Sequence, residues 1–311
     1  MTKLIVQIPC WNEEANLAAV IAGIPRRMEG VDAVEVLVID DGSTDRTAEA
    51  ATAAGADHLV RFTSHRGLAR AFAAGLDAAL KLGADLIVNT DADGQYRGED
   101  IPKLIAPILA GEADLCVGDR GIAADRDYPA LKQGLQRLGS WVVRRLSETD
   151  VADAASGFRA FSRQAALELS VVSEFTYTLE TLIAAGKKKL SVRSVPVAVN
   201  PPARPSRLYA SVPEYLRKSL ETMVRVYAMF EPMRVFALIG ALPFAAGSAI
   251  GLWFLYEYFT TGGKGHVQAL ILAAVLLIIG FQVMIFGLLA DLIAQNRKLI
   301  EDLLRRIKER P

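Results

Sequence analysis

Two aspartates stand one residue apart directly after an apolar run. Asp91 and Asp93 follow Leu86–Asn89 in the stretch NTDADGQYR. Strand interiors avoid Asp, but a carboxylate pair at the end of a strand can hold Mg²⁺ or Mn²⁺, hard cations that prefer oxygen ligands. A cation of this kind is suited to the charge of a diphosphate. The alternative is an Asx-type turn, which Asp-x-Asp-Gly also favours.

Polar clusters also follow three other apolar runs, at Pro9–Glu13, Asp40–Asp45 and Gly118–Arg120. Strand-like runs alternate with helical patterns up to about residue 200, and this alternation predicts a doubly wound, parallel sheet. Ligands of such sheets gather outside the carboxyl ends of the strands, so we expect the clusters to form one site. The predicted strands are Leu4–Ile8, Val34–Ile39, His58–Phe62, Leu86–Asn89, Leu115–Val117 and Val192–Val197. The predicted helices are Glu13–Arg26, Thr44–Ala54, Leu68–Leu82, Ile101–Leu109 and Leu131–Leu146.

Composition and missing motifs exclude several function classes. Lys and Arg number 35 and Asp and Glu also number 35, so no basic face for nucleic acid is expected. No G-x-G-x-x-G follows the first strand and no P-loop motif occurs, which leaves dinucleotide and P-loop sites unsupported. Cys10 and Cys116 lie in apolar runs and are predicted to be buried free thiols. No basic-then-apolar leader precedes Leu4, so we expect no signal peptide.

Two long segments near the C-terminus carry no charge, Val235–Tyr256 and Val267–Leu289. At 1.5 Å per residue each spans about 33 Å, enough to cross a bilayer core of about 30 Å. Two buried core helices are the alternative. The loop between the segments carries one Lys, whereas Arg and Lys are frequent on their other sides, and the positive-inside rule then places both termini in the cytoplasm. Gly247–Gly251 is a small-xxx-small pattern that lets helices approach closely.

Five motifs occur in chain order and together resemble the inverting family 2 glycosyltransferases. The resemblance covers about residues 3–230 and is strongest to the branch that moves sugar onto polyprenyl or dolichyl phosphate, the dolichol-phosphate mannose synthase-like enzymes. The Q-x-x-R-W motif of processive synthases is absent. The motifs are Pro9-x-Trp11-Asn12-Glu13, Asp40-Asp41-Gly42-Ser43-x-Asp45-x-Thr47, Gly67-Leu68-Ala69, Asp91-x-Asp93-x-Gln95 and Ser156-Gly157-Phe158-Arg159.

The resemblance implies a GT-A, Rossmann-like α/β fold with a mostly parallel sheet and helices on both faces. We expect a catalytic domain at residues 1–205, an interfacial amphipathic helix at 206–233, two transmembrane helices at 234–290 and a juxtamembrane helix at 291–311. A surface helix packed on the domain is the alternative for the amphipathic segment. The expected location is the inner membrane, with the catalytic domain and both termini in the cytoplasm.

The resemblance also assigns residues to the donor site. Asp91, Asp93 and Gln95 would hold Mg²⁺ or Mn²⁺. The pair Asp40 and Asp41 would face the ribose or base, although capping and a turn before the next helix are an alternative role. The same pocket would be lined by Pro9, Trp11 and Glu13, with Trp11 in a place where the family usually has Tyr or Phe.

The acceptor site is expected to involve acidic and basic side chains. Arg120 would bind the diphosphate, with a surface Arg as the alternative. Asp153 would orient the acceptor or its arginines, with proton removal as second choice and loop capping as the alternative. The family often has Asp-Pro at this point, where this chain has Ala154. A phosphate nucleophile has a second pKa near 6, so positioning matters more than base catalysis.

Three further arginines are expected to bind the acceptor phosphate, because a guanidinium binds phosphate oxygens in a fork. They are Arg159, Arg204 and Arg207, and the last two precede the proposed interfacial helix. A positive-inside anchor is the alternative for the last two. Tyr177 and Glu180 are interpreted as fold residues, although Glu180 matches a Glu that is frequent in the family.

The expected function is transfer of a hexose from a UDP- or GDP-sugar to polyprenyl phosphate, with inversion. A transferase acting on another membrane lipid such as diacylglycerol, and a non-catalytic nucleotide-binding membrane anchor, are the alternatives. A homo-oligomer, with a tetramer favoured, is expected from the resemblance. The sequence leaves the sugar and the base of the nucleotide open.

Overall fold

The computed structural model describes residues 1–121, 130–172, 176–201, 212–262 and 266–309. The chain divides into two compact units. The first comprises Met1–Val226 with Arg305–Pro311, and the second comprises Tyr227–Leu304. Arg204 and Arg207 lie outside the described residues.

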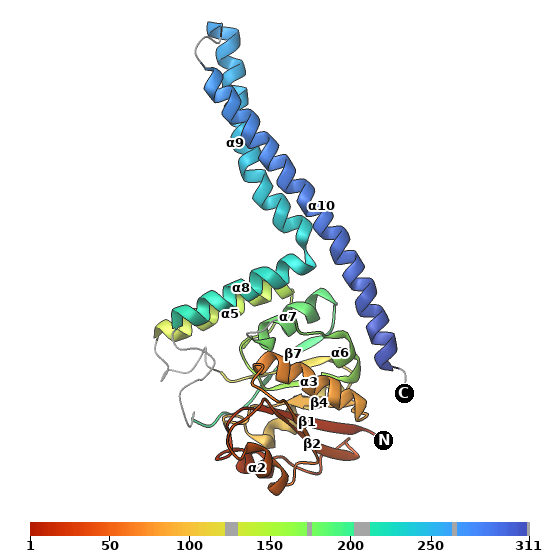
Figure 1. The fold of residues 1–311 in the computed structure, drawn as a ribbon. Coiled ribbons are helices and arrows are strands. Elements are labelled where there is room, and N and C mark those ends of the chain that lie inside the picture. The colour runs from red at the N-terminus through yellow and green to blue at the C-terminus, as the bar shows by residue number, and fades with distance from the viewer. Residues whose placement is uncertain (122–129, 173–175, 202–211, 263–265, 310–311) are drawn as a thin grey trace. The chain divides into compact units, whose positions relative to one another are not determined.

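The first unit is built on a seven-stranded sheet with the order β3-β2-β1-β4-β6-β5-β7 (Figure 1). All neighbouring strands pair in parallel except β6, which is antiparallel to β4 and to β5. The fold class predicted from the sequence is therefore confirmed, but β6 was not predicted. The strands are β1 (Lys3–Cys10), β2 (Ala33–Asp40), β3 (His58–Arg61), β4 (Leu86–Asn89), β5 (Leu115–Asp119), β6 (Arg159–Ser162) and β7 (Val192–Pro196).

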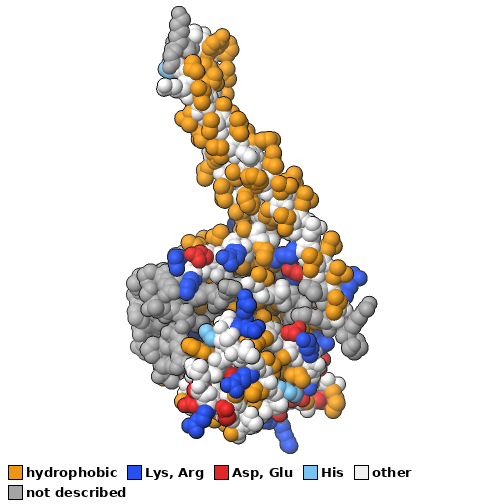
Figure 2. Space-filling model, in the orientation of Figure 1, with side chains coloured by type: hydrophobic (Ala, Val, Ile, Leu, Met, Phe, Trp, Pro, Cys, Tyr) orange, Lys and Arg blue, Asp and Glu red, His pale blue; other side chains and the backbone are white. Residues whose placement is uncertain are grey.

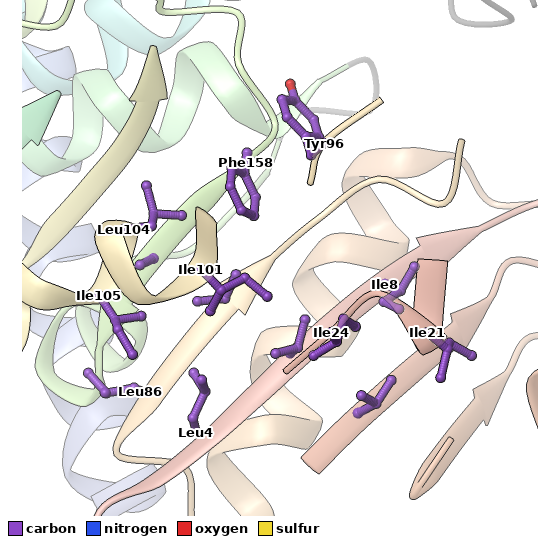
Figure 3. Packing of buried hydrophobic residues seen from close by; sticks show 14 of the residues in the cluster. Leu4, Ile8, Ile21, Ile24, Leu86, Tyr96, Ile101, Leu104, Ile105 and Phe158 are labelled. Carbon is purple, nitrogen blue, oxygen red and sulfur yellow. The ribbon is translucent and has the colours of Figure 1, made fainter. Parts of the chain in front are cut away.

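Helices pack on the sheet through alternate residues of the strands, because successive side chains point to opposite faces. Leu4 and Ile8 of β1 belong to a core cluster with Ile21 of α1 and Ile101 of α4, parts of which are shown in Figure 3. Helix α3 packs on β1 and β2. The helices of this unit are α1 (Leu17–Ala22), α2 (Thr47–Ala53), α3 (Leu68–Lys81), α4 (Ile101–Leu109), α5 (Ala130–Ser147), α6 (Arg163–Glu168), α7 (Tyr177–Lys187) and α8 (Val212–Phe230), whose last residues belong to the second unit.

The second unit contains two long helices, α9 (Pro232–Thr261) and α10 (Val267–Glu309). Both are long and apolar enough to cross a membrane, and only 11% of the most apolar window of each is buried. Figure 2 shows hydrophobic side chains covering their visible surface. Leu242 is 73% exposed and Phe259 is 80% exposed. An exposed apolar surface of this extent argues against the buried-core alternative for the two segments.

Helix α10 is continuous over 43 residues. It is therefore about 65 Å long, roughly twice the thickness of a bilayer core. The described part of the predicted juxtamembrane helix at 291–311 is helical and continues α10 without a break, because no Gly or Pro interrupts it after Gly287. Its position beside the membrane stays a prediction.

Glycines bring α9 and α10 together. A Cβ added at Gly240 would lie 2.7 Å from the carbonyl oxygen of Gly280, and one added at Gly247 would lie 2.9 Å from that of Ala273. At Gly251 the nearest atom is 3.9 Å away. The small-xxx-small pattern therefore acts through its first glycine, whereas the close contact at Gly280 was not predicted.

Candidate active site

The site lies at the carboxyl ends of the parallel strands β1, β2, β4 and β5. The antiparallel direction of β6 explains how a later segment reaches these strand ends. Arg159 begins β6 and pairs in register with Asn89 at the end of β4 and with Val117 of β5. The loop before β6, which carries Asp153, therefore returns to the carboxyl ends of the parallel strands.

The two aspartates after β4 have different surroundings. Asp93 is half-buried, and its Oδ1 accepts a hydrogen bond of 3.0 Å from the backbone N–H of Gln95, which is the turn that the sequence left open. Asp91 lies against Gly157, since a Cβ built there would be 2.9 Å from each of its carboxyl oxygens. Burial, helped by the charge of Asp93, raises the pKa of the Asp91 carboxyl to about 7, against the opposing charges of Arg120 and Arg159.

This carboxylate pair fits a divalent cation. Desolvation and mutual repulsion are the two causes that disfavour the charge on Asp91, and a cation beside it would offset both. Among the residues that the structure describes, no three His, Cys, Asp or Glu side chains gather as a metal cluster. The predicted ligand set of Asp91, Asp93 and the Gln95 amide contains only two carboxylates, so water and phosphate oxygens would complete it, as is usual for Mg²⁺.

Arg120 and Asp153 form a bidentate ion pair. Nε of Arg120 donates to Oδ2 of Asp153 at 2.6 Å, and Nη2 donates to Oδ1 at 3.0 Å. The two side chains are only 13% and 3% exposed. Burial opposes the charge of Arg120, but Asp153, Tyr96 and Asp91 together raise its pKa. The structure thus brings together two predicted site residues, and the predicted role of Asp153 toward the acceptor stays a prediction.

Arg159, predicted to bind the acceptor phosphate, lies in the interior of the domain. Its side chain is fully buried, and every guanidinium nitrogen donates to protein oxygens. The acceptors are the carbonyls of Ala154, Ser156 and Thr178 and the hydroxyl of Thr181. Four of its five N–H groups are thus used within the protein, and Arg159 joins the loop before β6 to α7. Its contact with a lipid phosphate stays a prediction.

Asp40 and Asp41 are also buried. Oδ1 of Asp40 accepts from the backbone N–H of Ser43, and its Oδ2 lies 3.1 Å from Nε of Arg61. The carboxylate of Asp41 accepts from the backbone N–H groups of Arg66 and Gly67 at 2.7 and 2.9 Å. Asp40 thus stabilises the turn after β2, as the structural alternative expects, whereas Asp41 joins this turn to the residues before α3. Contact of either residue with a ribose or base stays a prediction.

The residues after β1 lie beside the loop that precedes α3, which carries His65, Arg66 and Gly67. The ring of Trp11 stacks on His65 with centroids 4.3 Å apart. Nδ1 of His65 lies 2.9 Å from Oδ2 of Asp41. Pro9 is buried near the end of β1. Glu13 is also buried, and its carboxylate accepts a hydrogen bond from the side chain of Asn16. Sequence reasoning missed His65, which could have been found only from its place just before the Gly67 motif.

A groove of about 440 Å³ opens beside Asp93. One wall comes from α1 and the residue before it, Asn16, and the other from the turn after β4. Asn200 closes the groove, because its backbone N–H donates to the carbonyl of Gln95 and its side chain bonds Gly94 and Arg97. Arg97 and Asn200 were not predicted as site residues, since neither stands in a recognised motif.

Comparisons with known proteins agree with this architecture. Residues 5–169 match the family described as glycosyl transferase family 2, and residues 231–295 match the GtrB C-terminal hairpin. The chain is similar to glycosyltransferase AglJ of Haloferax volcanii, with 30% identity over 95% of this chain and 96% of the relative. It is 32% identical to the polyprenol monophosphomannose synthase of Mycolicibacterium smegmatis over 57% of this chain and 69% of the relative.

Solved structures show the same fold. The glucosyl-3-phosphoglycerate synthase of Mycobacterium tuberculosis, crystallised with Mn²⁺, UDP-glucose and phosphoglyceric acid, aligns with a TM-score of 0.58 and 23% identity over 74% of this chain and 79% of that one. Since the matched segment covers more than half of the chain and one relative aligns along nearly all of it, the protein belongs to glycosyl transferase family 2.

Proposed function

We propose that the protein is a membrane-bound, inverting glycosyltransferase that moves a hexose from a UDP- or GDP-sugar to polyprenyl phosphate. The observation that carries the proposal is a family 2 domain with Asp91 and Asp93 at the rim of its sheet, joined in one chain to a GtrB-type hairpin. Relatives named as polyprenol monophosphomannose synthase and undecaprenyl-phosphate mannosyltransferase support this acceptor.

The donor would bind at the carboxyl ends of β1, β2 and β4. Asp91, Asp93 and Gln95 would hold Mg²⁺ or Mn²⁺, which when bound stabilises the negative charge of a departing diphosphate. Trp11, with its ring already stacked on His65, offers an aromatic surface for the base. The structures of a fold relative with Mn²⁺ support the choice of a divalent cation.

The acceptor would enter from the side of Arg120. An oxygen of the lipid phosphate would attack the anomeric carbon as the bond from that carbon to the diphosphate breaks, which inverts the configuration and releases the nucleoside diphosphate. Arg120, held in place by Asp153, would neutralise phosphate charge during this step. A phosphate nucleophile is mostly dianionic at pH 7, so Asp153 need not remove a proton. Arg204 and Arg207 remain proposed contacts of the lipid phosphate.

The two apolar helices would anchor the enzyme in the inner membrane as two spans. Arg234 stands at the N-terminal end of α9, and Arg297 stands on the C-terminal side of the apolar part of α10. By the positive-inside rule, both termini and the catalytic domain would lie in the cytoplasm. A homo-oligomer, with a tetramer as the favoured form, is part of the proposal.

The acceptor can be tested by changing both the lipid and Asp153. Purified protein would be given labelled UDP- and GDP-sugars with either undecaprenyl phosphate or diacylglycerol. We expect product only with undecaprenyl phosphate. We also expect Asp153→Asn to lower kcat by less than the factor of about 10²–10⁴ that is typical for the loss of a general base. Transfer to diacylglycerol that Asp153→Asn abolishes would support the alternative acceptor. Nucleotide binding without any transfer would support a non-catalytic anchor.

A further inference from the structure

A chain of buried polar side chains runs beneath Asp91. Gln7 of β1 and Asn89 of β4 are direct register partners in the parallel pair of strands. Nε2 of Gln7 donates to Oδ1 of Asn89 at 2.9 Å. Nδ2 of Asn89 donates to the carbonyl of Gly157 and to the hydroxyl of Tyr177, both at 2.8 Å. Gln7, Asn89 and Tyr177 are all fully buried.

These groups are costly to place in the middle of a sheet. A buried amide loses its hydration and must recover it in hydrogen bonds. Neighbouring positions of the same strands hold Val and Ile, which carry no such cost. Asn89 makes full use of both N–H groups and its carbonyl, although Oε1 of Gln7 has no hydrogen-bond partner among the described residues. Buried hydrogen bonds of this kind hold Asn89, Gly157 and Tyr177 in one arrangement.

The network ends against the carboxylate of Asp91. The place where a Cβ of residue 157 would stand is 2.9 Å from Oδ1 and from Oδ2 of Asp91, and 2.9 Å from the hydroxyl of Tyr177. The carboxylate and the phenol therefore rest on the same side of Gly157. The carbonyl of Gly157 in turn accepts from Asn89 and, at 3.2 Å, from Tyr177.

The ring of Tyr177 fixes the direction of its hydroxyl. It stacks on Phe72 with centroids 3.8 Å apart and planes 3° apart, and the guanidinium carbon of Arg159 lies 5.9 Å from the centroid of the Tyr177 ring. A phenylalanine at 177 would keep this stacking and lose only the hydroxyl. The hydrogen bonds of Tyr177 can therefore be removed while the packing of its ring is kept.

We propose that Tyr177 and Asn89 are positioning residues for the divalent cation. They hold Gly157 in place, and Gly157 supports the Asp91 carboxylate in the orientation that binds the metal. The inference rests on the proposed function, because it takes Asp91 as a metal ligand. Removing a group that orients a metal ligand in this way typically lowers metal affinity by about 10–100-fold.

The first test is Tyr177→Phe in the full-length protein. Mn²⁺ affinity would be measured by electron paramagnetic resonance at a fixed concentration of UDP or GDP, together with the thermal midpoint. We expect the Kd for Mn²⁺ to rise about tenfold. The matched control is Ser147→Ala, which also removes a buried hydroxyl, one that donates to the carbonyl of Val143. The control should leave Mn²⁺ affinity unchanged.

The second test separates positioning from stability. The double variant Gln7→Met with Asn89→Leu replaces both amides by apolar side chains of similar size, so neither amide is left unsatisfied. The carbonyl of Gly157 loses Asn89 but keeps the hydroxyl of Tyr177 as a donor, so the fold should keep most of its stability. We expect its thermal midpoint to stay within a few degrees of wild type while Mn²⁺ affinity falls by about tenfold or more.

Wild-type Mn²⁺ binding distinguishes the two ways in which the reasoning can fail. If the wild type binds Mn²⁺ and both variants bind it equally well, the positioning role is overturned and the proposed function stands. If the wild type binds no divalent cation with either nucleotide, the proposed metal role fails and this inference fails with it.

Discussion

The ion pair between Arg120 and Asp153 offers a test of the site's construction. The two side chains are 13% and 3% exposed and share two hydrogen bonds of 2.6 and 3.0 Å. Removing one partner of a buried pair leaves the other charge without compensation, at a cost of about 3–5 kcal/mol. Asp153→Asn keeps one oxygen that can accept from Arg120, so we expect a loss of about 3 kcal/mol.

A loss of this size lowers the thermal midpoint by about 6–12 °C for a domain of this size. The variant should still be folded at 25 °C, because domains have about 5–15 kcal/mol of stability. Thermal unfolding followed by circular dichroism would measure the midpoint. The control is Asp77→Asn, which breaks the exposed pair with Lys81 on α3 and should barely move it.

A double-mutant cycle then isolates the pair. Arg120→Gln alone should also destabilise, since Asp153 is then the buried charge without a partner. The double variant Arg120→Gln with Asp153→Asn should lose less than the sum of the two single variants, by about 1 kcal/mol or more. Additive losses, or an Asp153→Asn midpoint equal to that of the Asp77→Asn control, would refute the view that these residues form a coupled buried pair.

Three further predictions test the metal site and the packing. Without metal the pKa of the Asp91 carboxyl is raised to about 7, and the carboxyl must lose its proton to bind a cation. The apparent Kd for Mn²⁺ should therefore rise about tenfold per pH unit below pH 7 and level off above it. Calorimetry at pH 6, 7 and 8 would measure this dependence, and a Kd that does not change with pH would contradict it. Gly186→Ala should lower the thermal midpoint strongly, because its Cβ would overlap the backbone of the helix end beside it, whereas Gly139→Ala meets no atom within 4 Å and should be neutral or stabilising. Gly280→Leu should weaken the hairpin against unfolding by sodium dodecyl sulfate, since its Cβ would lie 2.6 Å from a backbone nitrogen, whereas Gly251→Ala should behave as wild type.

Much of the fold could be predicted because local patterns and long-range packing agree. Helix α4 begins and ends where predicted, at Ile101–Leu109, since its apolar residues repeat at helical spacing. Strand β6 was missed because four residues give too short a pattern, and its direction depends on its neighbours rather than on its own sequence. The helix predicted at Glu13–Arg26 is shorter, at Leu17–Ala22, because Asn12 adopts a positive φ of 53° and the chain turns before the helix begins.

The site was predicted less completely than the fold. Motif spacing indicates which residues approach the sheet edge, and Arg120 and Asp153 do meet there. It does not indicate which polar groups the protein itself satisfies. Arg159 was expected to face a phosphate, but most of its N–H groups donate to carbonyls of the loop before β6 and of α7, and no sequence pattern predicts these contacts. Asn89 and Tyr177 are 88 residues apart, so their contact follows from the tertiary fold alone.

The central claim is that carboxylates at the rim of the sheet support sugar transfer from a nucleotide to a lipid phosphate. The most direct measurement is transfer of labelled hexose from UDP- and GDP-sugars to undecaprenyl phosphate, by wild-type protein and by Asp93→Ala, with the lipid product identified by mass spectrometry. We predict a polyprenyl-phosphate hexose that requires Mg²⁺ or Mn²⁺ and is lost in Asp93→Ala. Undiminished transfer by Asp93→Ala, or no lipid product from the wild type with any hexose donor, would contradict the account.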